Sequence, residues 1–291
     1  RITSRPYAVM LDNHPNAYPQ SGMQKAAVVY EALAEYGITR YMVVFVPGIT
    51  EEVPNLGPVR SARLYYVQWA MGYQALYAHA GGSPQALDTL AKTKQVVNVD
   101  ALLRSGGAYF GRSKKRSAPH NLYTSTADLA KAAAKFGASE LDGGSIGYLF
   151  KSESPGVGGD AATSLSYYFL YKQDPAGWVY DAGTNSYLRT RRGKSGIDAA
   201  SGERLRTNNV VVIEVKERKI ANDPKGRIEQ DVVGSGVGRL FIDGVQREVT
   251  WRKDSTTTQL RFFNPDGSEV AFNPGQIWIT VVPSIKNLTV K

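Results

Sequence analysis

The sequence of 291 residues contains no cysteine. This absence excludes disulfides, thiolate nucleophiles and cysteine-ligated zinc, and it leaves the redox compartment open, because exported and cytosolic proteins can both lack cysteine. The sequence also lacks any run of about 18 apolar residues, the length that a membrane-spanning helix requires. The chain therefore predicts no transmembrane helix and no cysteine chemistry.

Histidine is scarce, and positive charge is not concentrated in one region. His14, His79 and His120 all lie in the N-terminal half. The net charge is +9, with 15 Lys/Arg against 10 Asp/Glu in residues 1–150 and 20 against 16 in residues 151–291. An excess spread so evenly is not typical of a nucleic-acid-binding face, so we expect no specific nucleic-acid partner. The densest basic run, Arg112 to Arg116, is either a solvated loop or a segment attracted to an anionic surface.

The length and composition fit a globular protein of two domains. The hydrophobic fraction is 42% and the charged fraction 21%. Residues 151–163 have the Gly, Ser and Pro content of a linker. We therefore predict one domain over residues 1–150 and a second over residues 164–291.

The N-terminal half reads as strands alternating with helices. Apolar segments predict strands, and apolar residues at helical spacing predict helices, several of them ending at Gly. The predicted strands are 7–11, 38–46, 75–80 and 96–99, and the predicted helices are 24–36, 58–71, 84–91 and 126–136. This alternation predicts an α/β domain with a largely parallel sheet and flanking helices.

The C-terminal half reads as a series of strands joined by turns, with Asp243-Gly244 and Asp266-Gly267 as the strongest hairpin signals. The predicted strands are 166–171, 178–180, 186–190, 209–215, 238–242, 245–253, 260–264, 269–272 and 276–282. Gly234 to Gly238 opens no helix and is better explained by a β-bulge or a close strand approach than by phosphate binding. We predict a mostly antiparallel β domain, and an α+β protein overall.

The motif Gly57-Pro58-Val59-Arg60-Ser61-Ala62-Arg63 carries two cations at a predicted helix start. Cations are disfavoured there unless an anion answers them, and residues three apart share a helix face. Arg60 and Arg63 are therefore candidates for binding an anionic ligand. The alternative is an internal ion pair with Glu31 or Glu35, which the predicted helix 24–36 places one turn apart. Those two carboxylates are themselves either an acid/base pair or a solvated helix face.

A second candidate is the strand, glycine turn and helix start around Gly81, Gly82 and Ser83. Free backbone N–H groups at such a start bind phosphate or an oxyanion, and glycine permits close approach. Ser83 and Pro84 suit the first positions of a helix. The alternative is a tight turn without a ligand, because the motif lacks the lysine and the spacing of a Walker loop.

A third candidate lies in Ala118-Pro119-His120-Asn121, with Arg112 just upstream. If these residues converge with Arg60, Arg63 and His79, they form a cationic cleft suited to phosphate or carboxylate. An imidazole there exchanges protons near neutral pH, which makes His120 and His79, together with Glu31, candidates for proton transfer. The alternative for His120 is a turn residue bonded to its neighbours. Ser125 with Asp128 resembles a capping box that starts the following helix.

Metal ligation would draw on four side chains, Asp12, His14, His79 and His120. None of them shows the short spacing between histidines that is typical of metal sites, so we expect no cofactor, with a divalent metal as the open alternative. The sequence also contains no Gly-x-Ser-x-Gly elbow of a serine hydrolase.

Motifs along nearly the whole chain resemble the YerB-like family of bacterial lipoproteins. The matching motifs are Asp12-Asn13-His14-Pro15, Pro19-Gln20-Ser21-Gly22, Tyr30-Glu31, Ile38-Thr39-Arg40, Gly57 to Arg63, His79 to Gly82, Arg112, Ala118 to Asn121, Asn209 to Val212, Gly234-Ser235-Gly236, Trp251 and Asn273 to Trp278. The resemblance implies two adjacent domains of unknown function, export to the bacterial cell surface and a lipid anchor on an N-terminal cysteine. No cysteine is among the 291 residues, so the anchor residue is not part of this sequence.

Two functions from different classes follow from these observations. The first is an extracytoplasmic envelope protein that binds an anionic ligand or partner through the Arg/His cleft. The second is an envelope enzyme, of phosphotransferase or phosphodiesterase type, that acts on a phosphorylated lipid or cell-wall polymer; the arginines would serve either by stabilising negative charge. Expected partners are an anionic small molecule, an envelope lipid or a wall polymer. A protein partner that adds a strand to the C-terminal domain stays open, and contact with the membrane is expected through the anchor alone.

Overall fold

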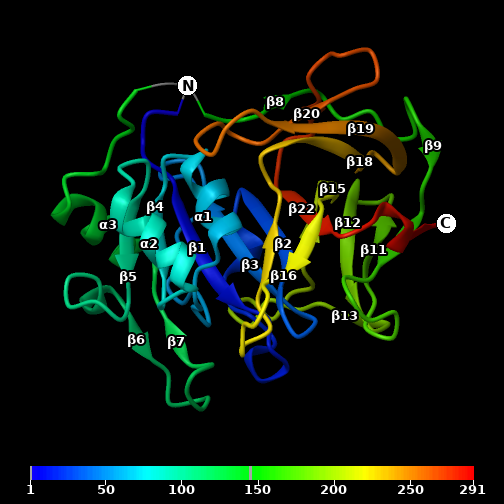
Figure 1. Cartoon of the computed structure of the whole chain (residues 1–291). Coiled ribbons are helices and arrows are strands. Elements are labelled where there is room, and N and C mark those ends of the chain that lie inside the picture. The colour runs from blue at the N-terminus through cyan, green and yellow to red at the C-terminus, as the bar shows by residue number, and fades with distance from the viewer. Residues whose placement is uncertain (1, 144–145) are drawn as a thin grey trace.

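One eleven-stranded sheet runs through the middle of the protein (Figure 1). The computed structural model describes residues 2–143 and 146–291. The strand order is β20-β19-β18-β15-β22-β2-β3-β1-β4-β5, and β9 pairs with β19. Their bounds are β1 Tyr7–Asp12, β2 Val28–Glu35, β3 Ile38–Phe45, β4 Leu76–His79, β5 Val97–Asp100, β9 Asp160–Ala161, β15 Asn209–Glu214, β18 Gly234–Ile242, β19 Val245–Lys253, β20 Arg261–Phe263 and β22 Ile277–Val282.

The sheet is continuous between the N-terminal and C-terminal halves of the chain. β22 pairs in parallel with β2, from Val28 opposite Ile277 to Ala32 opposite Val281, and β22 also pairs in parallel with β15. Every residue of β22 is buried. A nearly unbroken apolar run is what a strand covered on both faces requires, and it explains why β22 occupies the centre of the sheet.

The N-terminal part of the sheet is mixed, and the prediction of a largely parallel sheet is wrong in this respect. β1 and β2 both pair antiparallel to β3, while β4 pairs in parallel with β1 and with β5. The coarser prediction of a protein that mixes helices and strands is confirmed, and strands outnumber helices in the described residues.

The predicted helix over 24–36 is wrong. This segment forms the short 3₁₀ helix η2, Met23–Lys25, followed by strand β2. Its apolar residues are almost continuous from Val28 to Ala34, a pattern that fits a strand buried on both faces as well as a buried helix. Pairing with β3 and β22 decides in favour of the strand.

Three α-helices are present in the described residues: α1 Leu64–Met71, α2 Pro84–Lys92 and α3 Thr126–Lys135. The Ser83 hydroxyl accepts a hydrogen bond from Ala86 N–H at 3.4 Å and so caps α2. The Ser125 hydroxyl accepts from Asp128 N–H at 3.0 Å and donates to the Asp128 carboxylate at 2.8 Å, which confirms the predicted cap of α3. None of the helices in the described residues has the length and apolarity to cross a membrane.

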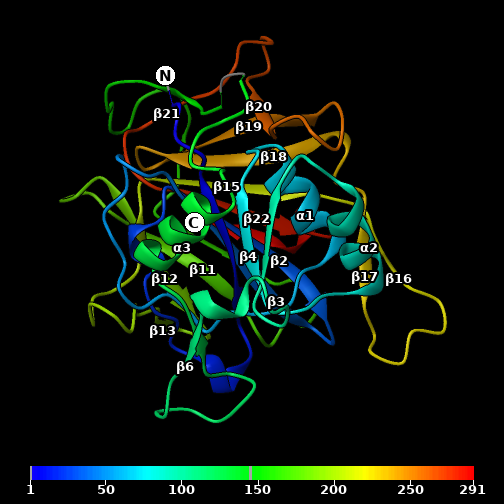
Figure 2. The same ribbon diagram turned by 90° about the vertical axis from the view of Figure 1, so that its left-hand side faces the viewer.

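The two faces of the main sheet carry different layers. Tyr30 of β2 stacks on Trp69 of α1 with ring centroids 5.0 Å apart, whereas the next residue, Glu31, contacts a smaller sheet on the other face, because neighbouring side chains of a strand point to opposite faces. Figure 2 shows α3 on the side of β4 opposite to α1 and α2. The smaller sheet has the order β13-β12-β11-β10-β23, with β14 on β12, and its bounds are β10 Ser164–Tyr167, β11 Ala176–Asp181, β12 Ser186–Arg191, β13 Lys194–Ser195, β14 Arg206–Thr207 and β23 Leu288–Val290.

Short hairpins and pairs complete the structure. The paired strands are β6 Gly111–Arg112 with β7 Leu122–Tyr123, β8 Leu149–Phe150 with β21 Ala271–Phe272, and β16 Glu217–Lys219 with β17 Ile228–Gln230. The remaining 3₁₀ helices are η1 Pro15–Ala17, η3 Gly107–Tyr109 and η4 Ile285–Asn287. Asp243 and Gly244 have φ of 57° and 76° between β18 and β19, as the predicted two-residue hairpin turn requires.

Gly234 to Gly238 lies in β18 and pairs with β19 without a register shift. A Cβ on Gly236 would lie 2.6 Å from Nε1 of Trp251. The close approach therefore explains Gly236, with the indole packed directly over its backbone, and no bulge is formed.

Candidate functional site

Arg60 does not lie on a helix, and neither does Arg63, so the predicted helix 58–71 is wrong over its first six residues. Arg60 lies in an extended segment whose N–H donates to Met10 O at 2.9 Å and whose carbonyl accepts from Ala80 N–H at 3.1 Å. The segment therefore sits between the carboxyl ends of β1 and β4. Ligands of open α/β sheets bind at this edge, where the chain connections diverge to opposite sides.

A buried carboxylate organises this edge. Asp12, at the end of β1, is 2% exposed. Its Oδ2 lies 2.7 Å from Nδ1 of His120 and 3.2 Å from Nε of Arg60, and its Oδ1 accepts from His14 N–H at 3.0 Å. We call Asp12, His14, Arg60 and His120 the Asp12 cluster. From the sequence, Asp12 is a candidate only as a metal ligand; its position at the end of a strand, two residues before a histidine, is the signal that points to this site.

The two histidines of the Asp12 cluster stack on each other. Their ring centroids lie 4.5 Å apart with the planes at 15°. Nδ1 of His14 accepts a hydrogen bond from Asn16 N–H at 3.2 Å, so the proton of a neutral His14 ring is on Nε2. Nδ1 of His120 donates to Asp12, which fixes the orientation of that ring and leaves its Nε2 on the other side. The arrangement presents two imidazoles and the Arg60 guanidinium beside one carboxylate.

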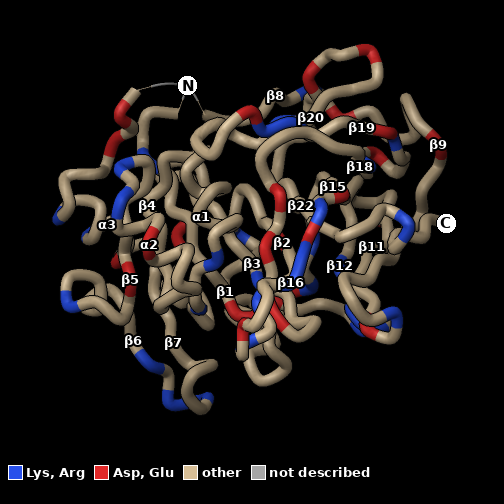
Figure 3. The backbone as a smooth tube through the Cα atoms, in the orientation of Figure 1, with Lys and Arg blue, Asp and Glu red and all other residues tan. Residues whose placement is uncertain are grey.

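The hairpin β6–β7 places Arg112 and Asn121 next to the Asp12 cluster. Val59 N–H donates to Leu122 O at 2.7 Å, which brings Asn121 alongside Arg60. Asn121 is buried and accepts from Nη1 of Arg112 at 2.7 Å, while its amide donates to Ser113 O at 3.0 Å. Asn121 thus holds the loop of the hairpin closed, and Arg112 is exposed. The basic run 112–116 forms the tip of this loop, blue at the bottom of Figure 3.

Arg63 belongs to a separate, internal ion pair. Its Nε and Nη2 donate to Oε2 of Glu35, and Arg40 donates to Oε1 of the same carboxylate. Burial, together with the neighbouring Arg63, lowers the pKa of Arg40 to about 10. Arg63 is 6% exposed. Arg63 therefore forms the internal ion pair with Glu35 that was the alternative to ligand binding. Its side chain is too deeply buried to reach a ligand.

Glu31 is buried, and its side chain contacts residues outside the Asp12 cluster. Both of its carboxylate oxygens accept from Nη2 of Arg189, at 2.9 and 2.8 Å, and the hydroxyl of Tyr167 donates to it at 3.3 Å. Burial by itself lowers the pKa of Arg189, but the Glu31 carboxylate outweighs it and holds that pKa above its ordinary value. Glu31 and Glu35 therefore have different arginine partners, and the i, i+4 helix pair that an acid/base role would need is not formed.

His79 and the glycine turn are occupied by internal hydrogen bonds. His79 is fully buried, with Nδ1 2.8 Å from Gly81 O and Nε2 2.7 Å from Oδ1 of Asn98. Gly81 N–H donates to Asp100 at 2.8 Å, and Ser83 N–H donates to Ala62 O at 3.1 Å. Two of the three N–H groups of the predicted phosphate loop at Gly81, Gly82 and Ser83 are thus already bonded to the protein.

The four predicted metal ligands do not come together. His79 lies in its own hydrogen-bonded pocket, apart from Asp12, His14 and His120. Across residues 2–143 and 146–291 no group of three or more His, Asp or Glu has an arrangement that would hold a metal ion.

The two large cavities lie away from the Asp12 cluster. One, of about 830 Å³, is lined by residues at the starts of β2 and β22, including Val28 and Ile277. The other, of about 420 Å³, lies between α1, the start of α2 and the hairpin β16–β17. The Asp12 cluster itself is partly exposed, with the side chains of Arg60 and His120 28% and 12% exposed.

Comparison with known proteins gives consistent matches over the whole chain. Residues 1–139 match the family model described as the N-terminal domain of a protein of unknown function, DUF3048, and residues 165–279 match the C-terminal domain of the same family. The chain is 32% identical over 287 residues to the "Putative lipoprotein YerB" of Bacillus subtilis strain 168, covering 97% of this chain and 82% of that protein.

The structure gives the same result. The crystal structure of the YerB protein from Bacillus subtilis superposes with a TM-score of 0.86 at 30% identity, covering 99% of this chain and 94% of that one. The fold and the order of the two matched regions are therefore shared along nearly the full length.

Proposed function

The chain belongs to the DUF3048 family of YerB-like proteins, and from that premise we propose that it is an extracytoplasmic, membrane-anchored lipoprotein that binds an anionic ligand at the Asp12 cluster. The ligand carries a phosphate or carboxylate group. A small molecule, an envelope lipid or a cell-wall polymer can supply that group.

The observation that carries this proposal is the shared use of one buried carboxylate by an arginine and a histidine. Asp12 contacts both Arg60 and His120 with the same oxygen. A buried carboxylate held by hydrogen bonds is a rigid anchor, so it fixes the positions of the groups that contact it. Arg60 and His120 come from segments 60 residues apart in the chain, and the carboxylate brings them to one edge of the sheet.

The charge balance of this edge favours an anion. The Asp12 carboxylate balances the Arg60 guanidinium, and the Arg112 guanidinium on the adjoining hairpin adds one positive charge. Guanidinium groups present a planar fork of donors that matches phosphate and carboxylate. The carboxylate of Asp12 contacts Arg60 only at Nε, which leaves the two terminal nitrogens of the fork for a ligand.

A second candidate function is supported by the Asp12–His120 pair. A carboxylate that accepts from Nδ1 holds an imidazole in one tautomer and orientation, which is what a general acid or base requires. The distance of 2.7 Å fits such a pair. Under this alternative the protein is an envelope enzyme that transfers or hydrolyses a phosphoryl group of a lipid or polymer.

Titration calorimetry with inorganic pyrophosphate tests the binding function. We expect Arg60→Gln to weaken binding at least tenfold, because it removes the one guanidinium in the Asp12 cluster. Arg252→Gln is the matched control, since Arg252 is an exposed arginine in β19 whose loss leaves the Asp12 cluster unchanged. Equal affinity of Arg60→Gln and the native protein contradicts the proposal.

The enzyme alternative is tested with polyprenyl phosphate and pyrophosphate substrates, with and without a divalent metal. Phosphate release that is lost in His120→Gln, while pyrophosphate still binds, supports catalysis. Binding without turnover in the native protein leaves the anion-binding function and removes the enzyme.

A further inference from the structure

A cavity of about 830 Å³ lies at the end of the main sheet opposite to the Asp12 cluster. Asp12 ends β1, whereas the cavity is lined by Pro6 before β1, by Val28 at the start of β2 and by Ile277 at the start of β22. The volume lies within the range of about 300–1,000 Å³ typical of small-molecule sites. The cavity is thus a second place for a ligand, independent of the proposed anion site.

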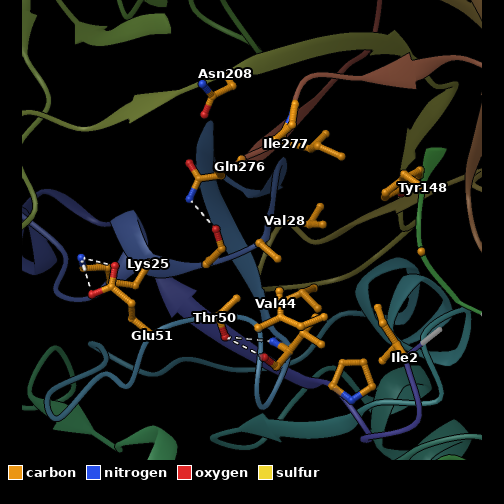
Figure 4. A pocket seen from close by; sticks show the side chains of 18 of the residues that line it. Ile2, Lys25, Val28, Val44, Thr50, Glu51, Tyr148, Asn208, Gln276 and Ile277 are labelled. Carbon is orange, nitrogen blue, oxygen red and sulfur yellow. Dashed lines mark hydrogen bonds and ion pairs between the residues drawn. The ribbon is translucent and has the colours of Figure 1, made fainter. Parts of the chain in front are cut away.

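The middle of the cavity is apolar. Val28, Val44 and Ile277 come from three neighbouring strands of the sheet, and Figure 4 shows them between the Lys25–Glu51 pair on one side and Tyr148 on the other. These three side chains are almost fully buried, and the apolar surface still open to water at this floor is that of Ile49 and Phe150, which line the cavity and are 68% and 56% exposed. A ligand that covers this floor gains affinity by removing apolar surface from water, so it carries an apolar chain.

The charges at one end of the cavity cancel. Two positive and two negative side chains line it there, and Lys25 donates to Glu51 at 2.7 Å. The four residues are Lys25, Glu51, Glu203 and Arg206. Because neither sign is in excess, this rim gives no advantage to an anionic or a cationic ligand.

The other end offers uncharged hydrogen-bonding groups. The hydroxyl of Tyr73 lies 2.9 Å from that of Tyr30 and 3.0 Å from that of Tyr148, and Tyr73 and Tyr148 line the cavity. Burial raises the pKa of Tyr73 and of Tyr148 above the ordinary value, so these hydroxyls are neutral at physiological pH. A neutral hydroxyl both donates and accepts.

One amide at this end has an unused donor. Gln259 is 7% exposed and lines the cavity, and its Oε1 accepts from Gly147 N–H at 3.0 Å. Its amide lies near the hydroxyls of Tyr73 and Tyr148, but within the described part of the chain Nε2 makes no contact with the geometry of a hydrogen bond. A buried donor without an acceptor is costly, and a ligand carbonyl or hydroxyl oxygen would remove that cost.

We propose that this cavity binds a single-chain amphiphile with an uncharged, oxygen-bearing head, of the monoacylglycerol class. The acyl chain lies along Val28, Val44 and Ile277, and the ester and hydroxyl oxygens of the head meet Gln259 and the tyrosine hydroxyls. Binding is reversible and involves no covalent step.

Calorimetric titration with monoacylglycerols of 8, 10 and 12 carbons, below their aggregation concentrations, tests the apolar floor. We expect the affinity to rise about fourfold for each methylene that enters the cavity. Ala27→Trp is designed to fill the cavity from the half-buried position before Val28 and lowers the affinity at least tenfold. Ala130→Trp on the exposed face of α3 is the matched control and leaves binding unchanged.

The head group is tested by comparing monocaprin with the anionic caprate, which has the same chain length. We expect monocaprin to bind about tenfold more tightly, and we expect Gln259→Leu to remove most of that preference while retaining the dependence on chain length. Absence of binding by the native protein, tighter binding of caprate, or equal binding in Ala27→Trp overturns the proposal. Amphiphile binding that is lost in Arg60→Gln and retained in Ala27→Trp assigns the ligand to the Asp12 cluster instead, so the two proposals fail separately.

Discussion

Arg189 in β12 donates to both carboxylate oxygens of Glu31 in β2, at 2.9 and 2.8 Å, across 158 residues of sequence. The guanidinium carbon of Arg189 lies 5.0 Å from the ring centroids of both Trp178 and Trp278. This ion pair is therefore buried between the main sheet and the smaller sheet, and it joins the two halves of the chain.

Removing the charge of Glu31 is expected to destabilise the whole protein. Glu31→Gln leaves the Arg189 guanidinium buried without a counter-charge, and breaking a buried ion pair in this way costs about 3–5 kcal/mol. Urea unfolding followed by tryptophan fluorescence measures the change. Glu229→Gln removes an exposed partner of Arg218 and serves as the control, with a loss below about 1 kcal/mol. A similar, small loss in both variants contradicts the structural role of the pair.

Arg63 is expected to affect stability and not ligand binding. Arg63→Gln breaks the bonds to Glu35 and lowers the free energy of unfolding by about 2–3 kcal/mol, the size expected for hydrogen bonds between charged groups. In a double-mutant cycle with Glu35→Gln the two losses are not additive. Pyrophosphate titration of the folded Arg63→Gln protein gives the native affinity. A tenfold weaker affinity would instead place Arg63 in the anion site.

Lys253 is expected to make stability rise with pH in mildly alkaline solution. Its ammonium is buried and bonded to the carbonyls of Thr256 and Thr258, and burial lowers its pKa to about 8. Between that value and the ordinary pKa of about 10.4 the unfolded chain binds more protons than the folded protein, so the free energy of unfolding increases with pH.

The measurement for Lys253 is thermal unfolding from pH 7 to pH 10. Lys253→Met removes the titrating group, so its melting temperature lacks the rise of the native protein over this interval. Parallel curves for the two proteins show that Lys253 does not carry the effect. Above pH 10 the buried tyrosines act in the opposite direction, because burial raises the pKa of residues such as Tyr187 and the unfolded chain loses their protons first.

Asn121 is expected to control the order of the loop that carries His120. Asn121→Ala removes the bonds to Arg112 and to Ser113 O, at a cost of about 1–2 kcal/mol for a buried side chain with two partners. Hydrogen exchange of residues 113–120 becomes faster, and pyrophosphate binding weakens because His120 is no longer held beside Asp12. Asn264→Ala, at an exposed turn, leaves both measurements at native values. Unchanged exchange in Asn121→Ala shows that the loop is ordered by other contacts.

Local chemistry made several elements predictable from the sequence. Ser125 with Asp128, Ser83 with Pro84, and Asp243-Gly244 each specify a cap or turn within about four residues, and all three are confirmed. Segment 24–36 was not predictable in this way. Its run of Val, Ala and Leu is compatible with a helix or a strand, and strand β22, about 250 residues further along the chain, decides between them.

The sequence identified residues of the candidate site better than it predicted how they are arranged. Arg60 and His120 were identified from charge and motif, and they share a carboxylate. The error for Arg63 came from extending α1 backwards through residues that are in extended conformation, which hid its contact with Glu35. Asp12 was undervalued because the pairing of a strand end with a loop 108 residues away has no local signal.

The central position of β22 constrains the order in which the protein is made. While the chain is being synthesised, the residues before Ile277 emerge before β22, so the edge of β2 from Val28 to Ala32 that faces away from β3 has no strand to pair with. An unpaired apolar edge invites aggregation. The N-terminal part of the sheet therefore keeps an open, aggregation-prone edge until β22 has been made and has paired with β2.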